Sequence, residues 1–385
     1  MRRFASLIAL AAAAVAVGCA PETPERLSVD AEEAYAAGEY SKAIAAYERM
    51  LEVSGESAMT YANLAQCALG ARDLEYARRC ADKALALEGS GATADRAREL
   101  QGMVAEARQD LPAATRAYRG LLGAEDARLR TRARSRLARL YARQKRADSA
   151  LALLLASYGE APQDAMTLYN LGTLCVNEPL RLRQPALDFF RLAERTLPAG
   201  SPERAKSKTW ITRLESNLNR LRQVPPSPGN TRKGAEYLRK ARENMERKRW
   251  RSAEDYARQA TQADPANFDA ALALGRICTQ NNHQSDGLKA YEAALVLRPD
   301  SPEARQEAAR LAYAMKRYDD AAAFLRPLLI AQPKNLAAAD LMMRILYAQQ
   351  RGADARVWGE YCLALMPKPT EAYRKFVESL PGGDA

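Results

Sequence analysis

Residues 271–300 read ALALGRICTQNNHQSDGLKAYEAALVLRPD, and their pattern recurs along the chain. The proline near the end of this stretch belongs to a series with a step of 34 residues: Pro265, Pro299, Pro333 and Pro367. A second series with the same step of 34 holds only small residues: Ala253, Gly287, Ala321 and Ala355. A fixed period of this length predicts a stack of similar units, each too small to bury an apolar face alone.

Alignment to this copy places nine units along the chain, and all but one have a small residue on both of their predicted helices. A large side chain at either position would push the two packed helices apart. The first-helix positions are Ala31, Ala65, Gly102, Ala138, Gly172, Ala241, Gly275, Ala309 and, as the one large exception, Met343. The second-helix positions are Ala43, Ala77, Ala114, Ala150, Ala186, Ala253, Gly287, Ala321 and Ala355.

A unit of 34 residues with a small residue twelve positions before a proline resembles the tetratricopeptide repeat, two antiparallel helices joined by a tight turn. The resemblance covers nearly all of the chain after its leader. It implies an all-α fold, an α-solenoid of stacked helix pairs. It also implies protein partners, but it leaves their identity open.

A proline-rich segment divides the repeats into two predicted arrays. Residues 224–230 read VPPSPGN, which breaks a helix and predicts a linker. We expect an N-terminal array at residues 27–223 and a C-terminal array at residues 231–380. Each array should end in a helix that covers its last exposed face, at Pro202–Gln223 and Thr370–Leu380.

The first residues, MRRFASLIALAAAAVAVGC, are typical of an exported bacterial protein. Two arginines precede an apolar run from Phe4 to Val17, which is shorter than the roughly 20 residues of a membrane-spanning helix. Val17-Gly18-Cys19 resembles a lipobox, whose cysteine receives diacylglycerol and becomes the new N-terminus. Ala16 stands where that motif usually has leucine, and an ordinary signal peptide with an incidental cysteine is the alternative.

We therefore expect a signal peptide at residues 1–18, lipid on Cys19 and a short tether at residues 19–26. Ala20 resembles the pattern of lipoproteins that are sorted to the outer membrane. The expected product is an outer-membrane lipoprotein that faces the periplasm. Its formal charge of +11, two of which belong to the leader, would suggest nucleic acid for a cytosolic protein, and export argues against that partner.

Few residues favour catalysis or metal binding. The chain has one histidine, His283, which we expect in an exposed turn, and it lacks the usual nucleophile, zinc and phosphate-loop motifs. Cysteines inside the predicted helices are expected to pack as small apolar residues, although a Cys67–Cys80 disulfide stays open. We expect no enzyme, no cofactor and no metal.

One helix stands out by its charge. Residues 128–146, RLRTRARSRLARLYARQKR, hold nine basic residues and no acidic one. Arg132, Arg136, Arg139 and Arg143 recur at helical spacing and form one face, which we name the arginine stripe. The repeat alignment implies that Arg132, Arg139 and Arg143 line the concave groove of such a solenoid. The family's two-carboxylate clamp does not carry over, because its lysine and asparagine positions are Ser135 and Arg139 here.

The arginine stripe predicts an acidic ligand. Like charges one turn apart destabilise a helix, and the planar guanidinium group suits carboxylates or phosphates. An acidic peptide or a lipid phosphate is the hypothesised ligand, and a solvated cationic face with nothing bound is the alternative. For the whole chain we expect a membrane-tethered scaffold that assists assembly of a pilus, secretin or outer-membrane complex. The other function considered is a regulatory subunit of enzymes that make or hydrolyse the cell wall.

Overall fold

The computed structural model describes residues 23–177, 180–221 and 226–382. The predicted signal peptide, Cys19 and part of the predicted linker lie outside these residues. Over the described ranges the chain forms helices and no strand, which confirms the all-α expectation. None of the helices in these ranges is long and apolar enough to cross a membrane.

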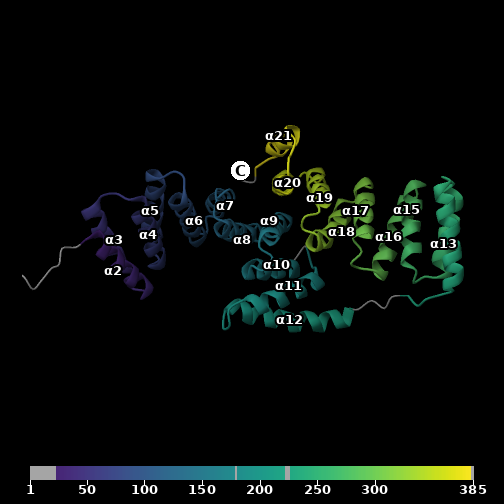
Figure 1. Cartoon of the computed structure of the whole chain (residues 1–385), viewed down its shortest axis with the longest axis horizontal. Helices are drawn as coiled ribbons and strands as arrows, with labels where there is room; N and C mark the ends of the chain where they lie inside the picture. The colour runs from purple at the N-terminus through teal and green to yellow at the C-terminus, as the bar shows by residue number, and fades with distance from the viewer. Residues whose placement is uncertain (1–22, 178–179, 222–225, 383–385) are drawn as a thin grey trace, which may run out of the picture. The chain divides into compact units, whose positions relative to one another are not determined.

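The first of two compact units ends at Ala133, within helix α8. Its helices pack in sequential antiparallel pairs, with α2 on α3, α4 on α5 and α6 on α7 (Figure 1). The bounds are α2 (Pro24–Ala36), α3 (Tyr40–Ser54), α4 (Ala58–Gly70), α5 (Leu74–Leu87), α6 (Ala92–Ala107), α7 (Leu111–Arg119) and the start of α8 (Ala127–Arg143).

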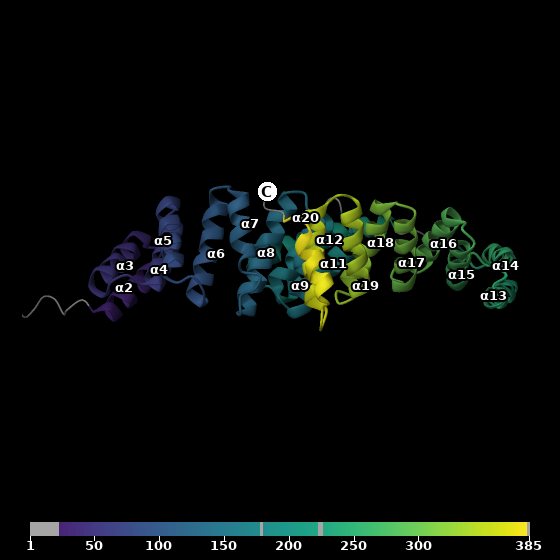
Figure 2. The ribbon, with the colours of Figure 1, turned by 90° about the horizontal axis from the view of Figure 1, so that it is seen from above.

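The second unit begins at Arg134 and continues the same pairing to the C-terminus. Figure 2 shows α13 to α19 following one another in a row. The bounds are α9 (Ala147–Glu160), α10 (Ala165–Val176), α11 (Arg183–Thr196), α12 (Pro202–Leu221), α13 (Thr231–Glu246), α14 (Trp250–Ala263), α15 (Phe268–Gln280), α16 (Gln284–Leu297), α17 (Pro302–Ala314), α18 (Tyr318–Ala331), α19 (Leu336–Ala348), α20 (Gly352–Leu365) and α21 (Glu371–Ser379).

Small residues allow the paired helices to approach closely, as expected. All nine second-helix positions are buried, from Ala43 to Ala355. Where the first helix has glycine, an aromatic ring of the second helix lies over it. A Cβ atom on Gly275 would lie 2.6 Å from the Tyr291 ring, and one on Gly172 would lie 2.9 Å from the Phe190 ring. The glycine therefore supplies the space that the ring occupies.

The turn inside each repeat adds a regularity that the sequence did not reveal. Five residues before each second-helix small residue, the backbone has a positive φ. At Arg72 the following amide, that of Asp73, donates to the Ala68 carbonyl at 2.9 Å, which is the bond that closes a helix end with a left-handed residue. The nine residues are Gly38, Arg72, Gln109, Lys145, Arg181, Lys248, Asn282, Lys316 and Gln350.

Prolines and capping side chains set the helix boundaries in the C-terminal repeats. Helices α14, α16, α18 and α20 each end two residues before their proline, as expected from the spacing. Two residues after Pro265 and Pro333, Asn267 and Asn335 cap the next first helix by accepting amide hydrogen bonds. Such a cap satisfies an amide that the helix start leaves without a partner.

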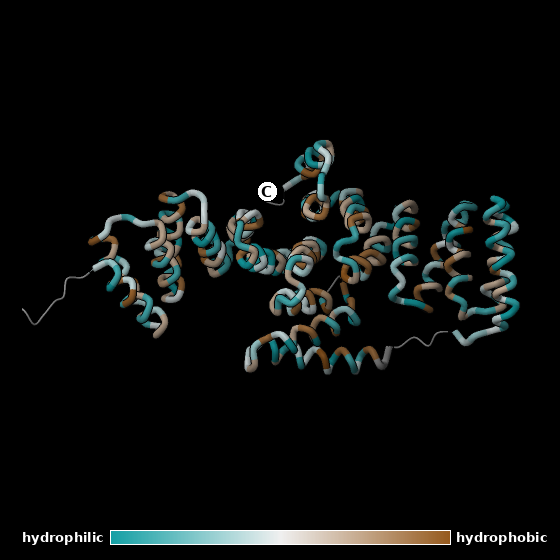
Figure 3. The backbone as a smooth tube through the Cα atoms, in the orientation of Figure 1, coloured by the Kyte–Doolittle hydropathy of each residue, from teal (hydrophilic) through white to brown (hydrophobic). Residues whose placement is uncertain are grey.

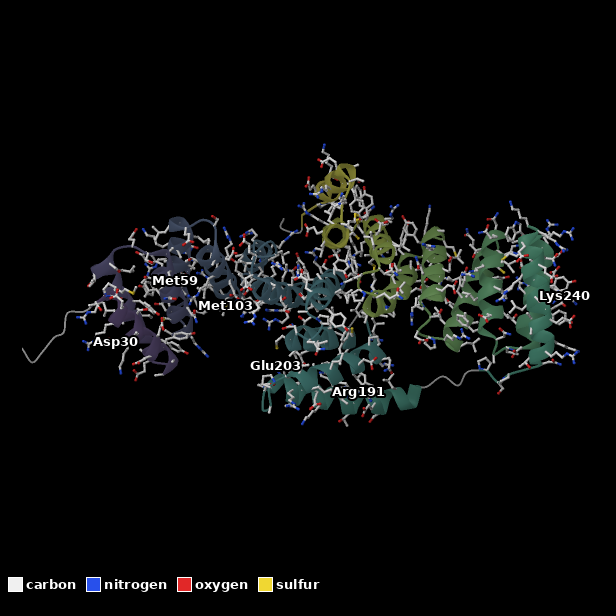
Figure 4. All side chains as sticks on the ribbon, viewed as in Figure 1. Asp30, Met59, Met103, Arg191, Glu203 and Lys240 are labelled. Atoms are coloured by element: carbon white, nitrogen blue, oxygen red, sulfur yellow. The ribbon has the colours of Figure 1, made fainter. Side chains whose placement is uncertain are left out.

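Helix α13 begins the C-terminal repeats and is the most polar of their first helices, drawn largely in teal in Figure 3. Only Gly234, Leu238 and Ala241 are buried on it. Its Lys240, labelled in Figure 4, pairs with Glu236 of the same helix at 2.7 Å. A polar outer face is what the terminal unit of a solenoid requires for solubility.

Two features of the structure bear on the predicted bounds of the tether and of the arrays. Helix α2 already begins at Pro24, inside the predicted tether of residues 19–26, because Thr23 caps it and a proline at the first helical position favours a helix start. Within the second unit, α9 packs against α20, so residues on both sides of the proline-rich segment touch (Figure 1). The division into residues 27–223 and 231–380 as separate arrays stays a prediction.

We predict that Gly275→Leu destabilises the second unit by roughly 1–3 kcal/mol, because the added side chain collides with the Tyr291 ring. All three tryptophans, Trp210, Trp250 and Trp358, lie in the second unit, so their fluorescence in urea reports its unfolding. Gly159→Leu is the control, since no atom lies within 4 Å of a Cβ built there. Equal effects of the two substitutions would contradict close packing at Gly275.

Candidate functional site

A hollow of about 840 Å³ in the first unit lies among α4, α6 and the start of α8. It borders the turn that follows α7, the second helix of its repeat. Helix α7 has only 9 residues, whereas α5, the second helix of the preceding repeat, has 14. Charged side chains of both signs line the hollow, among them Asp95, Arg96, Glu99 and Arg132. The mixed lining can bind polar groups of either charge.

Arg132, the first member of the arginine stripe, lies in this hollow and already has a carboxylate partner. Its Nε and Nη2 atoms donate to the two oxygens of Glu99 at 2.9 and 3.0 Å. The bond to Glu99 raises the pKa of the Arg132 guanidinium group. The arginine stripe follows from the sequence of α8 alone, and that sequence carries no sign of this pairing with the preceding repeat.

A second hollow, of about 380 Å³, lies beside the first two repeats between α2, α4 and α6. A chain of hydrogen bonds crosses it: Arg96 donates to Gln66 at 2.5 Å, and Gln66 donates to the Tyr35 hydroxyl at 2.9 Å. Met59, labelled in Figure 4, is 46% exposed at its edge. Amide, hydroxyl and thioether groups together suit an extended peptide, because they offer both hydrogen bonds and apolar contact.

The other members of the arginine stripe lie in the second unit, on the rest of α8. Arg139 and Arg143 are exposed. Arg136 is half-buried and has interactions of its own. Leu137 and Leu140 are buried, so this part of α8 packs through one face and presents arginines on another. Arg139 and Arg143 are the members that a ligand in solution can reach.

The single histidine does more than occupy an exposed turn. The His283 side chain is 56% exposed, yet its Nδ1 lies 2.8 Å from the buried carboxylate of Glu254. Arg258 and Asn281 also donate to Glu254, each at 2.7 Å. Burial alone would raise the pKa of Glu254, but the hydrogen bonds from Asn281, Arg258 and His283 lower that pKa to about 2. The cluster ties α14 to the turn before α16.

The cysteines of the described chain are free thiols, including Cys67 and Cys80, for which a disulfide had stayed open. All five are buried. Burial raises the pKa to about 11 for Cys67 and Cys80, and to about 12 for Cys175, Cys278 and Cys362. Such thiols carry little thiolate at neutral pH and pack as apolar groups. Among the described residues, no three His, Cys, Asp or Glu side chains gather as metal ligands would.

Stacked antiparallel helix pairs define the class of protein as an α-solenoid. A tetratricopeptide repeat profile matches residues 99–165 and 238–302, and another profile of the same description matches residues 285–345. Together with the nine regular turns, these matches show that the chain is a tetratricopeptide repeat protein, an interaction scaffold for other proteins.

Solved structures of similar repeats share little sequence with the chain. MamA from Desulfovibrio magneticus RS-1 is 15% identical over 38% of this chain and 81% of its own, with a TM-score of 0.35. PilF of Pseudomonas aeruginosa is 17% identical over 64% of this chain and 96% of its own, with a TM-score of 0.31. YrrB, described as a TPR protein with an unusual peptide-binding site, is 18% identical over 67% of this chain and 95% of its own, with a TM-score of 0.32. A comparison with curated protein sequences finds no match.

We predict that Glu254→Gln lowers stability at neutral pH and makes it less sensitive to acid. The pKa of Glu254 falls from 4.5 to about 2 on folding, so its carboxylate stabilises the fold above pH 4.5 and loses this effect as the pH falls toward 2. The difference from wild type should be at most about 3 kcal/mol at pH 7 and should vanish near pH 2. Tryptophan fluorescence in urea measures it, with the exposed Glu292→Gln as control. A constant difference over this range would contradict the role of Glu254.

Proposed function

We propose that the chain is a membrane-tethered scaffold of the bacterial envelope that holds partner proteins during assembly of a pilus, secretin or outer-membrane complex, and that it has no catalytic role. The observation that carries the proposal is the exposed arginine face of α8 on a solenoid of helix pairs. A rigid stack of repeats offers an extended surface that can receive a segment of another protein.

The leader supports the tethered part of this proposal. Cys19 precedes the first helical residue, Pro24, by five positions, and five residues span at most about 18 Å. A lipid on Cys19 would therefore hold the start of α2 close to the membrane surface. Stable attachment needs more than one acyl chain, because each buried CH₂ contributes about 0.8 kcal/mol.

The chemistry of α8 supports an acidic ligand. Arg139 and Arg143 are exposed one helical turn apart on a helix that has no acidic residue. Each guanidinium group can donate two parallel hydrogen bonds to a carboxylate. An acidic segment of a partner protein fits this face, and Arg132 and Arg136 add to its positive potential by their spacing on the same helix. Because Glu99 already binds Arg132, we assign the direct contacts to Arg139 and Arg143.

We predict that Cys19→Ala abolishes labelling by a fatty-acid analogue and releases the protein from the outer-membrane fraction. The reason is that the thiol of Cys19 is the expected site of diacylglycerol transfer. Fractionation of wild type and variant, followed by immunoblotting, measures the outcome. A wild-type protein found wholly in the soluble periplasmic fraction would show that the chain is not a lipoprotein.

We predict that Arg139→Glu combined with Arg143→Glu reduces capture of the acidic partner about tenfold or more, since charge reversal replaces attraction by repulsion. Lys233→Glu with Arg242→Glu makes the same change of charge at exposed positions of α13 and should leave capture intact. Crosslinking in cells followed by mass spectrometry gives the amount and identity of the partners. The helical circular dichroism signal should be unchanged in both variants.

The captured proteins decide between the two functions considered. Pilus, secretin or outer-membrane assembly factors that are lost from the α8 variant support the scaffold proposal. Cell-wall synthases or hydrolases would favour the regulatory alternative. Capture that survives reversal of both arginines at low salt would refute the arginine face as the binding site.

A further inference from the structure

Helix α9 is buried around its whole circumference, unlike the other second helices. Ten of its 14 residues are buried, whereas four of 14 are buried on α5 and on α14. The covering element is α20, which belongs to the last repeat and reaches α9 from about 200 residues further along the chain. Leu151 and Leu155 of α9 and Trp358 of α20 are also fully buried.

A buried carboxylate lies at the start of α9. Asp148 is 1% exposed and accepts hydrogen bonds from Arg326 of α18 at 2.9 and 3.2 Å. Arg351, which precedes α20, donates to the same carboxylate at 2.9 Å. The Trp358 indole donates to the backbone carbonyl of Asp148 at 3.1 Å. Three side chains from the C-terminal repeats therefore converge on one residue of α9.

The contact is reciprocal, because α20 also supplies a carboxylate to α9. Asp354, in the first turn of α20, accepts from Arg146 at 2.7 Å and from the Ser149 hydroxyl at 2.5 Å. It also accepts from Arg351 at 2.9 Å. Arg146 and Arg351 hold the same place in their repeats, four residues before Ala150 and Ala355. Each of these arginines stands at the N-cap position of its own helix, and its side chain reaches a carboxylate of the other helix.

Arg146 also connects this interface to α8. Its backbone amide donates to the Tyr141 carbonyl at 2.8 Å, and its guanidinium carbon lies 4.2 Å from the centre of the Tyr141 ring. Tyr141 is fully buried in the last turns of α8, between the exposed Arg139 and Arg143. Asp354 of α20 thus holds the turn that ends the arginine face of α8.

The charges make this contact dependent on both carboxylates. Arg146, Arg326 and Arg351 face Asp148 and Asp354, all within hydrogen-bonding distance. Removing one carboxylate leaves a buried arginine without its counter-charge, which is strongly destabilising for the contact.

We propose that the contact of α20 with α9 is a clasp by which the C-terminal repeats hold the end of α8 and position its arginine face for an acidic ligand. Asp354 and Asp148 are positioning residues in this clasp. The part that concerns the ligand rests on the proposed function, whereas the clasp itself does not. An opened clasp frees the turn at residues 144–146 and lets α8 fray from its C-terminal end.

The test is Asp354→Asn in the full-length protein, followed by hydrogen exchange and by binding of a deca-glutamate peptide. Exchange should accelerate about tenfold or more at both residues 141–150 and residues 351–358, which are far apart in sequence, since a lost buried partner opens both sides of the contact. Affinity for deca-glutamate should fall about three- to tenfold, the size of coupling that intervening residues carry. Asp148→Asn should act in the same way.

Two further variants separate the clasp from a general loss of stability. Asp320→Asn removes an exposed ion pair, with Arg317, that is local to α18, and it should change neither exchange at residues 141–150 nor affinity. Asp354→Glu keeps the charge, so it should retain more protection from exchange at residues 141–150 and more affinity for deca-glutamate than Asp354→Asn. Circular dichroism and tryptophan fluorescence verify that each variant is folded.

Each result bears on one part of the proposal. Faster exchange confined to residues 351–358 in Asp354→Asn overturns the clasp. Faster exchange on both sides with unchanged affinity for deca-glutamate overturns the positioning of α8. Arg139→Glu with Arg143→Glu, which should weaken binding of deca-glutamate about tenfold or more, checks that the peptide binds at α8. If wild type does not bind deca-glutamate, the proposed ligand is wrong, and the exchange measurement alone decides the clasp.

Discussion

The close approach of two helices at a small residue is the constraint on which every repeat of this molecule depends. Gly275 beneath the Tyr291 ring and Gly172 beneath the Phe190 ring show its strictest form, in which no side-chain atom fits between helix and ring. Elsewhere alanine occupies this position and is buried, as at Ala31, Ala65, Ala241 and Ala309. Since this contact fixes the geometry of each pair, repeats can stack with similar offsets, and the outward positions are free to vary.

Those outward positions carry most of the charge, and much of it is neutralised between successive repeats. Arg132 reaches Glu99 across 33 residues, and Arg258 reaches Asp286 across 28. The count of 58 lysines and arginines therefore overstates how many unpaired cations a ligand in solution meets. What distinguishes Arg139 and Arg143 is exposure on a helix without acidic residues, and that property follows from the local sequence.

Periodicity made the fold predictable from the sequence. The step of 34 residues, the small residues and the prolines each reflect a local requirement of the helix pair, so a single sequence contains them. The last capping helix, expected at Thr370–Leu380, is found at Glu371–Ser379 for the same reason. The fourteen residues of α9, ADSALALLLASYGE, also held a signal, because a helix that is apolar on all sides must be covered on all sides.

The partners of charged residues could not be predicted in the same way. Glu99 and Arg132 belong to different repeats, and Asp148 meets Arg351 only after the chain has returned from four further repeats. No repeat step relates Asp148 to Arg351, and the step of 33 between Glu99 and Arg132 becomes a contact only through the stacking of successive repeats. The same is true of Glu254, whose hydrogen-bond partners include His283, a residue that the sequence predicts only in an exposed turn.

The return of α20 to α9 has a consequence for how the newly made chain acquires its structure. Most repeats contact only their sequence neighbours and can fold as soon as they emerge. Helix α9 emerges before α20, whose Asp354 and Trp358 contact its first turn, and this partner arrives about 200 residues later. At synthesis rates of about 5–20 residues per second, that delay is about 10–40 s. During this interval the surface of α9 that α20 later covers is exposed and prone to aggregation. In this respect the chain folds like a protein with long-range contacts, which are slow to form, and unlike a simple repeat array.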